Sequence, residues 1–525
     1  MSPRIVFTLA ALLAPIVTHA TKAIANWDVV PYQRVSEPFN AGVVAFHETG
    51  VDVHFRINGE TAGVVKEPTL NARTKVWEYW ITIDPAKYPD GPLKLEAVAV
   101  PEGEGNEKRM LDTMLYANSG KTLGSKEIVW MSPNGDDAAD GSEGAPFATF
   151  KQAAEAAGDG GTIYLQKGDY KLLSFGKGDQ DYWTTISAAP GLDRSDVTIQ
   201  AYGKDNKVSH GRYGADKIRW HNVSLYCDRE SKWGSVFYIN KGQCVWFDDV
   251  EVYDKNGRFG DTQFINNQGG RIWLTDSVVR DIANVQINFQ RNAYYHDILA
   301  DIFRGSNNLT AINVNIVHMD KGDTAAHPDF IQFYNPKRDV ENVILYNVSA
   351  YDMFAQGFFG GGRVQDVAFV NVLLEKDPPE ASFLSQIGDM SHILIWNVTI
   401  VDQSFNFRGA ETMDLVYVQN GAYTTLSSAK YDHPGFFVDH CHASKTVYNQ
   451  PDLMGTNATT GDMVFVNYDA DDYRQAPESP AYASGQLPPG VPADIDGVPY
   501  DPAAPNRGAF AKANPGGRRP SVPLD

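Results

Sequence analysis

The chain has 525 residues, of which 43% are hydrophobic and 12% aromatic, and this composition excludes a disordered protein. Its length predicts two or three domains rather than one. The formal net charge of −20, from 65 acidic and 45 basic residues, argues against nucleic acid or an anionic membrane as a partner. An anionic polysaccharide remains open, because a local cluster of Arg and Lys fits within a negative protein.

Residues 1–25 have the pattern of a secretory signal peptide. Arg4 supplies a short charged region, Ile5 to Val17 an apolar run, and small residues offer cleavage sites that end at Ala20 or Ala25. The apolar run is too short to span a bilayer and does not recur later in the chain. We therefore expect a secreted or periplasmic protein without membrane insertion.

Residues 26–120 alternate apolar and polar side chains in short runs at 51–57, 77–83 and 93–100. Turn-forming residues separate these runs, including Asn58-Gly59. Period-two runs with such turns predict a small immunoglobulin-like β-sandwich. No catalytic motif stands out in it, so we expect an accessory domain.

The stretch from 127 to 170 carries a resemblance. It includes Val129-Trp-Met-Ser-Pro-Asn-Gly135, Ala145-Pro-Phe-Ala-Thr-Phe150 and Gly158-Asp-Gly-Gly-Thr-Ile-Tyr-Leu165. It resembles the opening of right-handed parallel β-helix proteins of the pectate lyase-like class, which includes polysaccharide lyases, mannuronan epimerases and polygalacturonase-like hydrolases. Thr149 and Gln152 fit a capping box for a short helix that would cover the end of the first coil. The resemblance implies a carbohydrate-active β-helix.

A ladder of short β-rich repeats then fills residues 127–460. An Asn or Asp shortly before Val or Ile recurs at Asn222, Asp249, Asp276, Asp297, Asn313, Asn347, Asn371 and Asn397. Repeats that are rich in β-branched residues and lack a 3.6-residue period predict the coils of a β-helix, with the asparagines stacked at a turn. Residues 461–525 lose the pattern and are expected to close the last coil and pack along its flank.

Cysteine is scarce, which excludes a framework of disulfides. The three cysteines are Cys227, Cys244 and Cys441. Cys227 and Cys244 either pair between neighbouring turns or remain buried thiols, and the sequence leaves both open.

Polar chemistry crowds into residues 318–332, which we predict to be the active-site rung. The predicted catalytic residues are His327, Lys321, Arg304 and Asp329, and the predicted substrate-binding residues are Gln332, Asp323, Arg291 and Gln356. Equivalent positions of successive coils lie about 5 Å apart, so we expect these side chains to converge on one face. A lyase needs a cation for the uronate carboxylate and a base for the C5 proton. Arg304 or Lys321 would supply the first and His327 the second.

Asp323 or Asp329 would orient His327 or bind calcium, which is the one cofactor that the pattern admits. A glycoside hydrolase is the first alternative, since two of the three residues Asp320, Asp323 and Asp329 could form the pair of carboxylates that it needs. An epimerase on the same fold is the second alternative, against which the order His327-Pro328-Asp329 counts, because it reverses the Asp-Pro-His motif of mannuronan epimerases. A non-catalytic glycan-binding β-helix is the third alternative, because fold alone does not choose a reaction. We expect a monomer that acts on an acidic polysaccharide.

Overall fold

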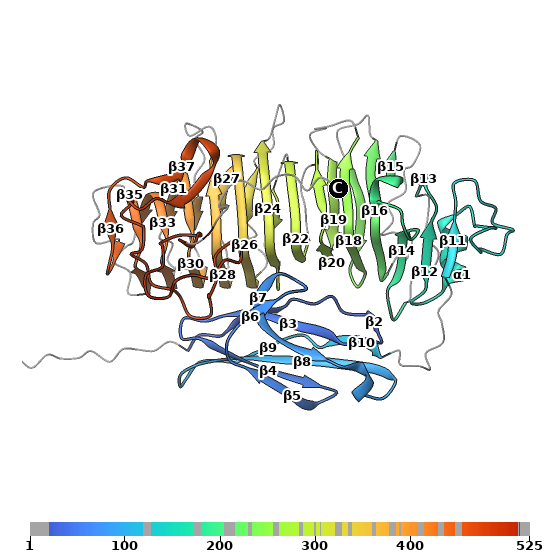
Figure 1. Cartoon of the computed structure of the whole chain (residues 1–525), viewed down its shortest axis with the longest axis horizontal. Coiled ribbons are helices and arrows are strands. Elements are labelled where there is room, and N and C mark those ends of the chain that lie inside the picture. The colour runs from blue at the N-terminus through green and yellow to red at the C-terminus, as the bar shows by residue number, and fades with distance from the viewer. Residues whose placement is uncertain are drawn as a thin grey trace, which may run out of the picture.

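The computed structural model describes most of the chain. The described residues are 20–118, 128–172, 180–203, 216–228, 234–255, 262–282, 287–298, 301–304, 306–320, 328–333, 339–359, 364–376, 385–387, 390–407, 414–428, 435–446, 454–512 and 514. They form a β-sandwich and a long parallel β-helix, as the sequence predicts (Figure 1). Among them, no helix is long and apolar enough to cross a membrane.

The sandwich consists of two sheets around one apolar core. One sheet has the order β1 (Ile24–Trp27), β3 (Phe39–Phe46), β7 (Val76–Ile83) and β6 (Thr69–Asn71); the other has β2 (Arg34–Val35), β10 (Met114–Asn118), β8 (Gly91–Pro101), β4 (Val51–Ile57) and β5 (Glu60–Val65), with β9 (Arg109–Met110) beside β8. In β4, Val51, Val53, Phe55 and Ile57 alternate into the core, as a strand with one buried face requires. The predicted domain boundary at residue 25 falls inside β1.

The β-helix is a 24-stranded spiral sheet among the described residues, from β11 to β36, and its pairings are parallel. We divide it into three faces. Sheet A contains β11 (Ile128–Met131), β12 (Thr162–Leu165), β14 (Thr184–Ala188), β20 (Arg271–Thr275), β30 (Met390–Trp396), β32 (Asp414–Gln419) and β34 (Phe436–Asp439). Longer strands turn a corner and serve sheet A with their first half and sheet B with their second: β16 (Ile218–Asp228), β18 (Cys244–Asp254), β22 (Phe289–Ile298), β24 (Thr310–Asp320), β26 (Val340–Phe354) and β28 (Val364–Glu375).

Sheet B also contains β13 (Gly168–Lys171), β15 (Val197–Gly203), β21 (Val278–Arg280), the first parts of β31 (Thr399–Phe407) and β33 (Ala422–Ser428), β35 (His442–Thr446) and β36 (Thr459–Thr460). Sheet C contains β23 (Phe303–Arg304), β25 (Asp329–Gln332), β27 (Gln356–Phe359), β29 (Ser385–Ile387) and the ends of β31 and β33. β17 (Gly234–Asn240) and β19 (Thr262–Gln268) pair with each other as a separate two-stranded parallel sheet. Inward side chains of all three sheets fill one continuous apolar core.

The corner between sheets A and B is made by the predicted ladder. Its members have φ between 49° and 56°: Asn222, Asp249, Asp276, Asn292, Asn313, Asn347, Asn371, Asn397, Asn420 and His440. Asn and Asp adopt this left-handed conformation at lower cost than most residues. The side-chain amide of Asn371 donates to Asn347 at 2.8 Å, and the amide of Asn397 donates to Asn371 at 2.9 Å.

One predicted member of the ladder was wrong. Asp297 is also left-handed, but it lies at the next corner, between sheets B and C, with Asp281, His318 and Asp352. Asn292 holds the ladder position in that coil. An acidic or amide residue before a β-branched one occurs at both corners, so this local pattern does not distinguish them.

The first coil is covered by α1 (Phe150–Ala157), as predicted. The Thr149 hydroxyl accepts a hydrogen bond from the backbone N–H of Gln152, and Phe150 and Ala153 face the core. The three cysteines are free and buried, which settles the alternative that the sequence left open.

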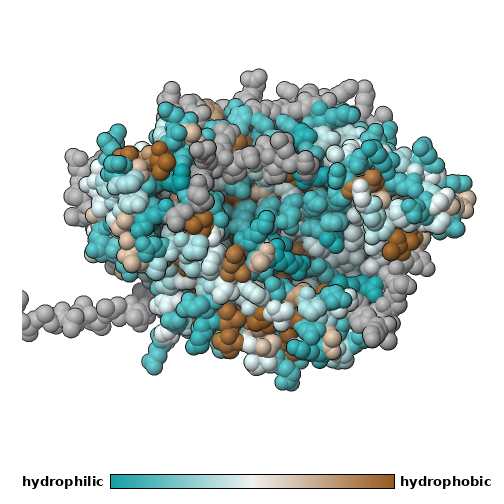
Figure 2. All heavy atoms as spheres, in the orientation of Figure 1, coloured by the Kyte–Doolittle hydropathy of each residue, from teal (hydrophilic) through white to brown (hydrophobic). Residues whose placement is uncertain are grey.

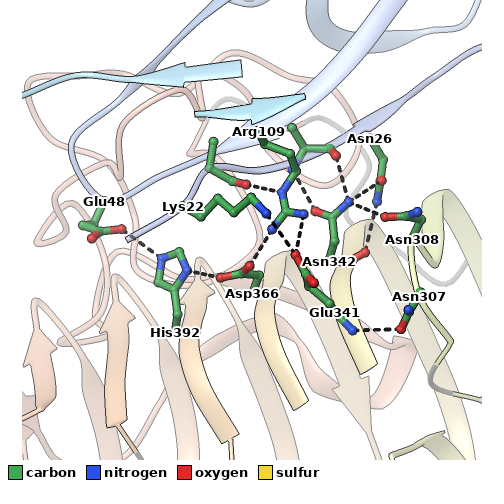
Figure 3. Close-up of polar contacts among 12 residues, drawn as sticks. Lys22, Asn26, Glu48, Arg109, Asn307, Asn308, Glu341, Asn342, Asp366 and His392 are labelled. Atoms are coloured by element: carbon green, nitrogen blue, oxygen red, sulfur yellow. Dashed lines mark hydrogen bonds and ion pairs between the residues drawn. The ribbon is translucent and has the colours of Figure 1, made fainter. Parts of the chain in front are cut away.

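The sandwich lies against the outward face of sheet A (Figure 1). Phe46 of β3 packs edge-to-face on Tyr346 at 5.3 Å and contacts Trp396. Polar contacts flank this apolar patch: Arg109 of β9 bonds Glu341 at 2.8 Å and Asp366 at 2.5 Å (Figure 3). The two parts of the chain are therefore joined by both apolar and charged contacts.

Residues 461–512, the C-terminal segment, pack on the far end of sheet B. They begin with the hairpin β37 (Phe465–Asn467) and β38 (Asp472–Gln475). Tyr473 stacks on Tyr351 of β26 with ring centroids 6.1 Å apart, and Phe510 joins the same cluster as Leu373. Sheet B is thus covered at this end.

Candidate functional site

The structure aligns part of the predicted active-site rung on sheet C. Asp329 is level with Gln356, and Gln332 with Arg304, on neighbouring coils. Asp329 is fully buried; its carboxylate accepts from Nε2 of Gln332 at 2.8 Å, and its N–H donates to Asp301 at 3.0 Å. This burial excludes direct contact between Asp329 and a polymer, although it allows Asp329 to orient a neighbouring group.

Three predicted residues, His327, Lys321 and Asp323, lie outside the described residues. Gln356 is half-buried, and its backbone N–H donates to the Pro328 carbonyl at 3.1 Å. The carbonyl oxygen of its side chain is buried and meets no hydrogen-bond donor in the described part of the chain.

The structure does not place Arg291 in this group, and its predicted convergence was wrong. Arg291 points outward from sheet A, beneath the sandwich, where its Nη1 bonds Asp28 of the sandwich at 2.7 Å. Its side chain is only 12% exposed. The sequence could not reveal this, because the ion pair forms only when two distant parts of the chain pack together.

A second polar group lies on the exposed first half of sheet B. Tyr226, Tyr253, Arg280 and His296 occupy one register position on successive coils. We call these four residues the outward row. The surface over the middle of the β-helix is mainly hydrophilic in the view of Figure 2, whereas hydrophobic residues gather on the sandwich below it.

Arg280 is held flat within this row. Its guanidinium lies 4.1 Å from the ring centroid of Tyr253, its Nε donates to Glu251 at 2.8 Å and its Nη1 donates to Asp281 at 2.8 Å. Stacking together with two carboxylates fixes the plane of the guanidinium. Within the described residues Nη2 has no such acceptor, and the side chain is 28% exposed, so this nitrogen can meet an external carboxylate.

The environment of the two tyrosines of the row disfavours their ionised form. Burial raises the pKa of Tyr253, with a further contribution from Glu251, and burial together with Asp169 raises that of Tyr226. Tyr226 and Tyr253 also stack on each other with centroids 5.8 Å apart. With Arg280 on its other side, Tyr253 has both ring faces covered and offers its edge and hydroxyl rather than a face for a sugar ring.

Two histidines share one carboxylate next to Arg280. Asp297 lies 2.8 Å from Nδ1 of His296 and 2.6 Å from Nδ1 of His318. The side chains of His296 and His318 are 17% and 39% exposed. A carboxylate that accepts from Nδ1–H fixes the tautomer in which Nε2 is the basic atom. The group therefore offers two oriented imidazoles for proton transfer.

The sequence held a signal for this row that we missed. Each member stands four positions after its ladder residue: Tyr226 after Asn222, Tyr253 after Asp249, Arg280 after Asp276 and His296 after Asn292. With Asp297 placed on the ladder in error, the last of these positions was hidden.

One group of three His, Cys, Asp or Glu side chains converges closely enough for a metal within the described residues: His47, Glu48 and His392. It lies between the sandwich and the β-helix, away from the outward row. Calcium at the predicted rung stays an expectation from the sequence.

Neither the family models nor the curated protein sequences match this chain. Among solved structures it is similar to a complex of XylC with xylose, with 8% identity over 62% of this chain and 76% of that one, at a TM-score of 0.31. It is also similar to a rhamnogalacturonan lyase, with 12% identity over 74% of this chain and 97% of that one, at a TM-score of 0.31. Similarities this low do not bear on the reaction.

Proposed function

We propose that the chain is a lyase that cleaves an acidic, uronate-containing polysaccharide by β-elimination on the exposed half of sheet B. The observation that carries this proposal is the carboxylate of Asp297 between His296 and His318, one coil from Arg280. The sequence resemblance to β-helix polysaccharide lyases supports it.

Arg280, His296 and His318 lie on successive coils, which supports the following division of roles. Nη2 of Arg280 binds the uronate carboxylate, which makes the C5 proton more acidic. Nε2 of His296 takes that proton, the C4–O bond breaks, and a C4–C5 double bond forms. His318, in its imidazolium form, donates the Nε2 proton to the leaving glycosidic oxygen, and solvent then takes the proton from His296 and reprotonates His318. Lys255, whose Nζ lies 5.2 Å from the ring centroid of Tyr226, adds a second cation for a neighbouring uronate.

His327 is the alternative base, predicted from the sequence. It belongs to residues 321–327, which connect the end of β24 with Pro328 just before β25. It would replace His296 as the base and leave the role of Arg280 unchanged.

The test is the ultraviolet absorbance of unsaturated uronate during incubation with alginates, pectates and glycosaminoglycans, with and without a calcium chelator. Wild type, His296→Gln and His327→Ala are compared with His440→Asn. His440 is a matched control, since it also pairs with an adjacent aspartate, at 2.8 Å, but lies on a late coil where Asn suits its left-handed backbone.

We expect wild type and His440→Asn to give the same rise in absorbance. One of the other two variants, His296→Gln or His327→Ala, lacks the base, and its rate should fall by about 100-fold or more. Activity that both substitutions leave intact would place the site elsewhere. New reducing ends without unsaturation would replace the lyase with a hydrolase. Binding without either product would leave a glycan-binding module.

We further propose that the protein is exported and cleaved after Ala20. Thr21 is buried and its hydroxyl lies 2.8 Å from Nε2 of His47, and Ile24 begins β1. Cleavage after Ala25 would remove half of that strand. The intact mass of the secreted protein should give Thr21 as the first residue, whereas Asn26 in that position would contradict the proposal.

A further inference from the structure

The sandwich and the β-helix together build a convergent set of metal-ligating groups. His47 and Glu48 directly follow β3 of the sandwich. Figure 3 shows Glu48 facing His392, which lies on β30 of sheet A. Oε2 of Glu48 is 3.2 Å from Nε2 of His392 and 3.6 Å from Nε2 of His47. One ligand atom from each residue lies within 4.8 Å of the others. A tetrahedral ion with bonds near 2.0 Å holds its ligand atoms about 3.3 Å apart, and the two separations from Oε2 of Glu48, 3.2 and 3.6 Å, already match that spacing.

Each imidazole is oriented by a second contact on its other nitrogen. Nδ1 of His392 lies 2.6 Å from Asp366, and Nδ1 of His47 lies 2.9 Å from the Thr49 hydroxyl. Asp366 is itself fixed by Arg109 at 2.5 Å. Such outer contacts are what metal-binding histidines ordinarily have, because they turn Nε2 toward the ion.

The cluster is shielded from water. The side chain of His47 is fully buried, that of His392 is 6% exposed and that of Glu48 is 16% exposed. The Thr21 hydroxyl lies against two of the three ligating groups, 2.5 Å from Oε1 of Glu48 and 2.8 Å from Nε2 of His47. Burial of the three ligands from bulk water suits an ion that joins the two parts of the chain rather than one that meets a substrate.

The surrounding charges favour a cation. The buried and half-buried groups comprise three carboxylates, on Glu48, Asp366 and Glu341, and two cations, on Arg109 and Lys22. If the histidines are neutral, one negative charge is left over. An uncompensated charge costs several kcal/mol in a buried site, so it is balanced by a proton on His392, by the α-ammonium that cleavage after Ala20 leaves on Thr21, or by a divalent ion.

We propose that His47, Glu48 and His392 bind one zinc ion, or a similar divalent first-row transition metal, that fastens the sandwich to the β-helix. Two imidazoles and one carboxylate are a ligand set that zinc accepts, whereas calcium prefers oxygen ligands alone. Water or the Thr21 hydroxyl supplies the fourth ligand. The site is separate from the outward row, so it can succeed or fail independently of the proposed lyase activity.

The experiment loads the tag-free mature chain with one equivalent of Zn²⁺, removes loose metal on a desalting column and measures bound zinc by mass spectrometry. We expect about one zinc per wild-type chain and a melting temperature at least about 2 °C above that of the chelator-treated protein. Cobalt in place of zinc should give the visible absorption of a four-coordinate ion.

The variants are Glu48→Gln and His392→Asn, with His54→Asn as the control. Asn suits the left-handed backbone of His392, whose φ is 53°, and the neighbouring coils carry Asp366 and Asn342 at the equivalent position, so this variant should fold. His54 is exposed on β4 and outside the cluster. We expect the first two variants to lose the zinc and the thermal shift, and His54→Asn to keep both. No retained zinc in wild type, or equal retention in all folded variants, overturns the site.

Discussion

Sheets A and B are formed by the same coils, yet the outward face of sheet A is covered by the sandwich and part of the outward face of sheet B is exposed. On sheet A the outward residues Ile312, Ile344 and Val370 are apolar and fully buried under the sandwich. On sheet B, at the coils of the outward row, the corresponding face carries Arg280 and His296 and remains accessible. The core side of both sheets is equally apolar. The difference therefore lies only in the outward positions.

The far end of sheet B shows that the polarity of the outward residues decides whether a face is covered or exposed. After β24 its outward residues become Tyr351, Leu373 and Val401, and there the C-terminal segment covers them. An apolar strip left in water invites association, whereas covering Arg280 or His296 would require new partners for their polar atoms. On sheets A and B, the outward surface is thus covered by another part of the chain where its residues are apolar and left accessible where they are polar.

Removing an apolar anchor of the cover on sheet A should have the largest effect. Phe46 is 3% exposed and packs on Tyr346 and Trp396. Phe46→Ala should lower the free energy of unfolding by about 4 kcal/mol, measured by urea denaturation. Phe437→Ala is the matched control, since Phe437 lies on the same sheet at 46% exposure, and it should cost less than about 1 kcal/mol. Equal losses would show that the sandwich contributes little to stability.

The free energy of unfolding should depend on pH through His442, which lies near Arg507 of the C-terminal segment. Burial, together with Arg507, lowers the pKa of His442 from 6.5 to about 4. The folded state therefore resists protonation, and the stability from neutral His442 is complete above pH 6.5 and lost as the pH falls toward 4. The full loss is about 3 kcal/mol. Urea midpoints between pH 7 and 4.5 should fall less in His442→Gln than in wild type; parallel curves would contradict this assignment.

The exposed half of sheet B is tested by Arg280→Gln. Removing the cation should lower kcat/KM on an acidic polysaccharide by about 100-fold, equivalent to about 2.7 kcal/mol of transition-state stabilisation, with little change in melting temperature. Arg271→Gln is the control, because Arg271 also pairs with an aspartate, Asp112, but is 50% exposed at the edge of the sandwich. A neutral polysaccharide cleaved equally well by both variants would remove the acidic substrate from the proposal.

The fold could be predicted because its strongest constraint is local. Each coil needs a residue that tolerates a left-handed backbone at the corner between sheets A and B. Asn222, Asn347 and Asn371 indicate the position of that corner in the sequence. The same locality explains the error at Asp297, because its neighbours look alike at both corners. Spacing along a whole coil, rather than the local pattern, identifies Asn292.

The site was harder to predict because its residues are neighbours only across coils. Local density of polar residues led to the segment around Asp329, which the structure places partly in the interior. The cluster between the two domains was beyond sequence reasoning, since Glu48 and His392 are 344 positions apart and meet only through docking. No periodicity links them.

The corner that joins the two sheets should show the smallest effect. Asn292 has a φ of 50°, donates to Asp276 at 2.8 Å and accepts from Asn313 at 3.0 Å. Asn292→Ala adds left-handed strain to the loss of these bonds, so it should cost about 2 kcal/mol in urea denaturation. Asn292→Gly loses the same bonds without the strain and should cost about half as much. Equal costs would mean that the hydrogen-bonded ladder, rather than the backbone conformation, sets the angle between the covered face and the exposed one, and Asn would then be required at this corner for its side chain alone.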